Sequence, residues 1–123
     1  MKSQLTLGQL IFQLERLNPE ANVLFDFCGE IPTTLDSYRG IYAHLAIGHQ
    51  APEHNVEPCV AKILLERCKN ALGATFTGWK GGEFTMDKDT PVWVANRGQC
   101  HGTAIVDVID FEWHAVIETA YFD

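Results

Sequence analysis

A tetrad with a hydroxyl, an aromatic ring, a guanidinium and a glycine is the first group of residues suited to bind an anion. Its residues are Ser37, Tyr38, Arg39 and Gly40, and Tyr42 follows two positions later. The guanidinium could hold a phosphate through two parallel hydrogen bonds, the hydroxyl could add a donor, and either tyrosine could stack on a base. Alternatively, the arginine is structural and pairs with Asp36 or Asp26 at the start of a strand.

A second cation is followed by two glycines. The residues are Lys80, Gly81 and Gly82, and Glu83 opens the next expected strand. Consecutive backbone N–H groups beside glycine can form a concave nest for an anion. The spacing and the Ser or Thr of a phosphate-binding loop are missing, so the alternative is a tight hairpin turn.

Three further residues could complete a binding site. Trp93 alternates with Val92 and Val94, so its ring is either a stacking platform or part of the core, and the pattern favours the core. Asn96 could read the edge of a base or simply make a turn. His101 and Thr103 resemble one half of the paired motif of two-histidine phosphoesterases, but a second copy is absent. We therefore assign no catalytic residue.

Glycine, cations and rings at this density predict a pocket for an anionic, ring-bearing small molecule.

At 123 residues one domain, 1–123, is expected, and a composition of 46% hydrophobic and 20% charged residues is typical of a globular protein. The formal charge of -7 argues against an extended nucleic-acid partner, which requires a basic face. Neither a signal peptide nor a membrane span is recognisable, so we expect a soluble, intracellular protein.

The cysteines and histidines give no sign of a metal site. Cys28, Cys59, Cys68 and Cys100 form no C-x-x-C pair, and free buried thiols in a reducing compartment are the favoured interpretation. Several histidines lie close together, but no carboxylate joins them at metal-ligand spacing. We expect no metal and no cofactor.

Hydrophobic periodicity predicts two helices and several strands. Apolar spacing and a capping box at Thr6 predict a helix at about 6–17, and Pro58 and Gly73 bracket a second at about 58–72. Strands are expected at 22–27 and about 39–47, with 33–36 as a loop or short turn. Short strands follow near 75–78, 83–86 and 92–95, and then a long strand at 103–110 and a last strand at 114–121. The fold class is α+β, a mostly antiparallel sheet with two helices packed on one face.

Three blocks resemble a family of small phage-encoded proteins. They are the tetrad Ser37–Gly40, the run F-T-G-W-K-G-G-E-F at 76–84 and the run T-P-V-W-V-A-N at 90–96. The resemblance covers most of the chain from 35 to 108. Arg97 stands where the family pattern has an aromatic, which leaves its role unassigned.

The resemblance implies an accessory protein made in the bacterial host cytoplasm that counters host defence. Together with the pocket chemistry it implies that the protein sequesters a nucleotide-derived immune signal, such as a cyclic ADP-ribose isomer or a cyclic dinucleotide, without converting it. Burial of the ligand between subunits would favour a homodimer or larger homo-oligomer. The alternatives are a hydrolase that cleaves such a signal with His101, and an inhibitor whose acidic surface binds a defence protein. Sequestration requires Arg39 and Lys80 to meet at one cavity.

Overall fold

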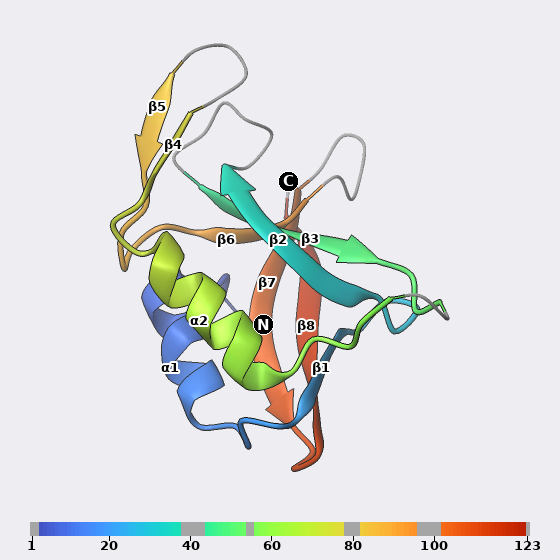
Figure 1. The fold of residues 1–123 in the computed structure, drawn as a ribbon. Coiled ribbons are helices and arrows are strands. Elements are labelled where there is room, and N and C mark those ends of the chain that lie inside the picture. Colours follow the sequence, from blue (N-terminus) through green and yellow to red (C-terminus); the bar gives the residue numbers. More distant parts are fainter. Residues whose placement is uncertain (1–2, 38–43, 54–55, 78–81, 96–101, 123) are drawn as a thin grey trace.

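The structure, a computed structural model, describes residues 3–37, 44–53, 56–77, 82–95 and 102–122 (Figure 1). Its elements in chain order are α1 (Leu7–Glu15), β1 (Asn22–Phe25), β2 (Ile31–Ser37), β3 (Leu45–Gln50), α2 (Ala61–Ala71), β4 (Thr75–Thr77), β5 (Glu83–Thr85), β6 (Val92–Val94), β7 (Gly102–Asp110) and β8 (His114–Phe122). The predicted α+β class is confirmed.

The first helix begins where the capping box predicts. The Thr6 hydroxyl accepts from the Gln9 backbone N–H at 3.3 Å, and the Gln9 side-chain oxygen accepts from the Thr6 N–H at 2.9 Å. These bonds satisfy two N–H groups that the first helical turn would leave unpaired. The buried residues of α1 follow helical spacing, namely Leu7, Leu10, Ile11 and Leu14.

The second helix is three residues shorter at its start than predicted. Val60 has extended backbone and pairs with Asn22 in an isolated bridge, so α2 begins at Ala61 and Pro58 precedes it. The helix ends before Gly73, whose φ of 82° is accessible to glycine without a Cβ penalty. The Gly73 N–H donates to the Met86 carbonyl and joins the end of α2 to the residue after β5.

The main sheet is mixed, which corrects the prediction of a mostly antiparallel sheet. Its strand order is β1-β8-β7-β6-β3-β2. β1 runs parallel to β8, and β3 runs parallel to β6, whereas the other three neighbouring pairs are antiparallel. β4 and β5 form a separate two-stranded antiparallel sheet. Alternating hydrophobicity identifies a strand and its buried face, but it carries no information about the direction of the neighbour.

Residues 33–36 belong to β2, so the prediction of a loop there is wrong. Pro32 is tolerated because β2 is an edge strand and its register with β3 shifts between Pro32 and Leu35. The predicted strand at 39–47 is only partly described. β3 begins at Leu45 and continues beyond the expected end to Gln50, while 38–43 lie outside the described residues.

Both helices lie on the same side of the main sheet (Figure 1). Their apolar faces join one buried cluster with sheet residues that include Leu45, Ile47, Val92, Val94 and Ile117. Residues that alternate with these, Ala46 on β3 and Trp93 on β6, therefore lie on the opposite face. We call this second surface the open face. The described helices are too short and too polar to cross a bilayer.

Candidate functional site

Three of the predicted ligand-binding residues lie in the described part of the chain: Ser37, Gly82 and Trp93. The other eight lie outside it and are Tyr38, Arg39, Gly40, Tyr42, Lys80, Gly81, Asn96 and His101. The predicted meeting of Arg39 and Lys80 therefore stays a prediction. Ser37 is buried at the end of β2, and Gly82 is exposed next to β5.

The sheet brings the end of β2 into line with the tryptophan of β6. Asp36 on β2 is in register with Ala46 on β3, and Ala46 is in register with Trp93 on β6. Residues in register across neighbouring strands share a face, and two strand spacings amount to roughly 10 Å. Asp36 and Trp93 thus lie on the open face with one small alanine between them. Ser37 alternates with Asp36 and points to the opposite face.

Trp93 is partly buried but is not part of the apolar core cluster. Its indole stacks on the ring of His44, with centroids 6.0 Å apart and planes inclined by 15°. Ala104 of β7 is its register partner on the other side, so small residues flank it on both strands. Burial lowers the pKa of His44 below its usual 6.5, because the charged imidazolium loses water. Trp93 is therefore a half-covered ring on the open face.

A hollow with a volume of about 410 Å³ lies on the open face beside this row. We call it the open-face hollow, and it is lined by Thr33, Thr34, Asp36, Ala46, Gly48, His49 and Ala95. Its side chains offer hydroxyls and one carboxylate. The hollow depends on the absence of a side chain at Gly48, because a Cβ there would lie 2.6 Å from the Thr33 hydroxyl. The Asp36 carboxylate already accepts from the Ser37 backbone N–H at 2.7 Å, which fixes one of its two oxygens.

His49 is held on both ring nitrogens. Nδ1 lies 2.8 Å from a Glu30 carboxylate oxygen, and Nε2 lies 3.1 Å from the Ala95 carbonyl oxygen. Both partners are acceptors, so both contacts are hydrogen bonds only when the ring carries two protons. The ring joins the end of β3 to the residue that follows β6. Because neither nitrogen faces the hollow freely, His49 has a structural role and is poorly placed to act as a general base.

Most residues of the hollow were missed from the sequence. Asp36 was considered only as a partner for Arg39, and His49 only among the clustered histidines weighed as metal ligands. The assignment of 33–36 to a loop hid the alternation that places Thr34 and Asp36 on one face. A β-branched pair followed by Leu35 was the available signal for a strand.

Cys59 and Cys68 are free and buried as expected, whereas Cys28 is exposed, which corrects that part of the prediction; Cys100 lies outside the described residues.

Within the described residues, no group of three or more His, Cys, Asp or Glu side chains could hold a metal ion. Comparison of the chain with protein-family models, with curated proteins and with solved structures finds no match.

Proposed function

We propose that the protein binds and sequesters a nucleotide-derived signal, such as a cyclic ADP-ribose isomer or a cyclic dinucleotide, at the open-face hollow. The observation that carries the proposal is the register of Asp36, Ala46 and Trp93, which puts the carboxylate that lines the hollow in one row with the tryptophan of the third sequence block. The role in countering host defence rests on the resemblance to phage-encoded proteins.

The described chemistry of the hollow suits the nucleoside half of such a ligand. Its volume of about 410 Å³ lies within the range of roughly 300–1,000 Å³ usual for small-molecule pockets. A carboxylate is the group that commonly accepts hydrogen bonds from ribose hydroxyls, and Asp36 has one oxygen left for that purpose. The partly covered ring of Trp93 lies one residue away along the same row and could contact a base.

The phosphates need cations, which the hollow itself does not supply. Arg39 follows Asp36 by three positions, so we assign the phosphate contact to Arg39 and the second contact to Lys80. Both ring nitrogens of His49 are engaged by Glu30 and by the Ala95 carbonyl. The described residues that line the hollow therefore offer no free imidazole for acid–base catalysis, which agrees with sequestration. A homodimer or larger assembly would bury the ligand further.

Isothermal titration of the protein with a panel of cyclic ADP-ribose isomers and cyclic dinucleotides tests the proposal. At least one should bind, and chromatography after denaturation should recover it intact. Asp36→Asn keeps the oxygen that accepts from Ser37 but removes the charge, and it should weaken binding by about 1.5–3 kcal/mol, or roughly 10- to 150-fold. Glu66→Gln on the exposed side of α2 is the matched control and should leave affinity unchanged.

The same experiment separates the alternatives. Altered ligand in the recovered fraction would replace sequestration with hydrolysis. No heat with any member of the panel would overturn the proposal, and the inhibitor of a defence protein would then be the hypothesis to pursue. Size-exclusion chromatography with and without ligand tests the expected assembly.

A further inference from the structure

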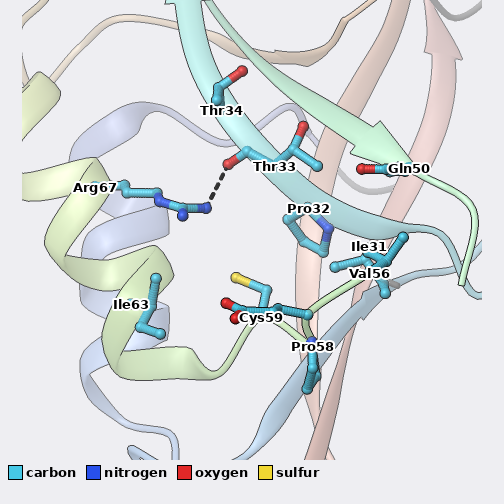
Figure 2. Close-up of a pocket in the computed structure, with 11 residues that line it drawn as sticks. Ile31, Pro32, Thr33, Thr34, Gln50, Val56, Pro58, Cys59, Ile63 and Arg67 are labelled. Carbon is cyan, nitrogen blue, oxygen red and sulfur yellow. Dashed lines mark hydrogen bonds between the residues drawn. The ribbon is translucent and has the colours of Figure 1, made fainter. Parts of the chain in front are cut away.

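A second cavity, which we call the β2–α2 cavity, lies between edge strand β2 and helix α2 on the other side of the strand (Figure 2). Its volume is about 250 Å³. The apolar part of its wall comes from three segments, with the side chains of Ile31, Pro32, Val56, Pro58 and Ile63. Ile63 is 38% exposed, so water contacts apolar surface here that a ligand could cover.

Arg67 provides an oriented cation at this cavity. Its Nη1 donates to the Thr33 carbonyl at 2.8 Å, which fixes the guanidinium against the edge of β2 (Figure 2). A guanidinium has five N–H donors, so four remain after this bond. Among the described residues, no carboxylate lies within 4.0 Å of Arg67. The remaining donors suit a carboxylate, which binds a guanidinium through two parallel hydrogen bonds.

Glu57 adds the opposite charge to the same cavity. It forms no ion pair with Arg67 within 4.0 Å, so each charge stays available to a ligand. A phosphate would meet Arg67 favourably but would be repelled by Glu57. A ligand with one negative and one positive group satisfies both side chains.

The edge of β2 is poorly suited to add a peptide strand, which is the other common use of such a groove. Pro32 has no N–H to donate, and the Thr33 carbonyl already accepts from Arg67. The volume also lies below the roughly 300–1,000 Å³ of pockets for drug-sized ligands. Both points favour a small molecule with an apolar body.

We propose that the β2–α2 cavity binds an aliphatic α-amino acid as its zwitterion. The carboxylate binds Arg67, the ammonium group binds Glu57, and the side chain packs against the apolar wall that includes Ile63. The cavity shares Thr33 and Thr34 with the open-face hollow, but Arg67, Glu57 and Ile63 do not line the hollow, so this proposal does not rest on the function proposed there.

Titration with L-leucine, followed by calorimetry or by NMR shifts, tests the site. Two analogues separate the contributions of the two charged groups of leucine to binding: 4-methylpentanoate lacks the ammonium group, and 3-methylbutylamine lacks the carboxylate. L-leucine should bind, and each analogue should bind at least roughly tenfold more weakly, because each leaves one charged side chain without its partner.

Two variants assign the contacts. Arg67→Gln should weaken leucine binding by roughly tenfold or more, and Glu57→Gln should remove the advantage of leucine over 4-methylpentanoate. Lys69→Gln and Glu66→Gln, exposed changes on the same helix, are the matched controls. Thermal unfolding of each variant checks that it folds. In the described structure the Glu57 side chain forms no hydrogen bond or ion pair, so Glu57→Gln should fold normally. It therefore still tests the proposal if Arg67→Gln unfolds.

The absence of leucine binding at millimolar concentration would overturn the proposal, as would equal binding by the wild-type protein and Glu57→Gln. Asp36→Asn should leave leucine affinity unchanged while it weakens binding of the nucleotide. Failure of leucine to bind therefore leaves the nucleotide proposal standing, and failure of the nucleotide panel leaves the amino-acid site standing.

Discussion

Trp93 lies across Gly102 so closely that a Cβ at Gly102 would stand 2.2 Å from Cζ3 of the indole. The strand pairing explains the contact, because Trp93 is in register with Ala104, two residues further along β7. A glycine and an alanine on β7 thus make room for the largest side chain of the open face. The position of the indole beside the open-face hollow depends on this space.

Gly102→Ala should therefore displace the indole and destabilise the protein by about 1–3 kcal/mol, the usual cost of overpacking. Urea unfolding measures the change. In a Trp93→Ala background the same substitution should cost much less, because the clashing ring is gone. Gly82→Ala is the control: Gly82 is exposed, and its Cβ would approach only the far end of the partly buried Phe84 ring, at 3.1 Å. Equal losses in both backgrounds would contradict the contact.

The capping box of α1 makes a second prediction. Thr6→Ala removes the acceptor for the Gln9 N–H and should lower the free energy of unfolding by about 0.5–2 kcal/mol. Thr6→Ser keeps the hydroxyl and should recover most of the loss. Chemical denaturation measures the free energy of unfolding of the wild-type protein and the two variants. A serine variant as unstable as the alanine variant would show that the loss comes from the missing methyl group and not from the missing cap.

The third prediction concerns pH. Burial lowers the pKa of His44 below 6.5, so the unfolded chain takes up a proton at this site before the folded protein does. Stability should thus fall as pH drops below about 6.5, and the fall should end once pH is below the lowered folded pKa. Unfolding free energies at several pH values between 7.5 and 4.5 test this. The wild-type curve is compared with that of His44→Gln, and a difference between the two that does not vary with pH would refute the prediction.

The fourth prediction concerns the thiols. Burial raises the pKa of Cys68 to about 12, and it also raises the pKa of Cys59, where Arg67 opposes the shift in part. The thiolate is the reactive form, so both should resist alkylation in the folded protein at pH 8. Exposed Cys28 should react quickly. Brief iodoacetamide treatment and peptide mass spectrometry assign each site, with Cys28→Ser as the control; native-state labelling of Cys68 would count against its burial.

The sequence alone determined the local features whose causes are local. The cap at Thr6, the apolar stripe of α1 and the stop at Gly73 follow from bonds and dihedral angles within a few residues. Alternation also put Trp93 on the face away from Val92 and Val94, as the structure has it. It did not reveal β2, because Pro32 signals a break in the chain and is acceptable only on an edge strand beside a register shift.

The tertiary structure decided which strands are neighbours, and with them both cavities. A strand edge forms backbone hydrogen bonds with a parallel or an antiparallel partner, so the local sequence does not select β8 for β1 or β6 for β3. That selection depends on how all the apolar faces can be buried at once. Only after it is made does Asp36 lie in one row with Trp93, and only the packing of α2 beside β2 brings Arg67 to the Thr33 carbonyl.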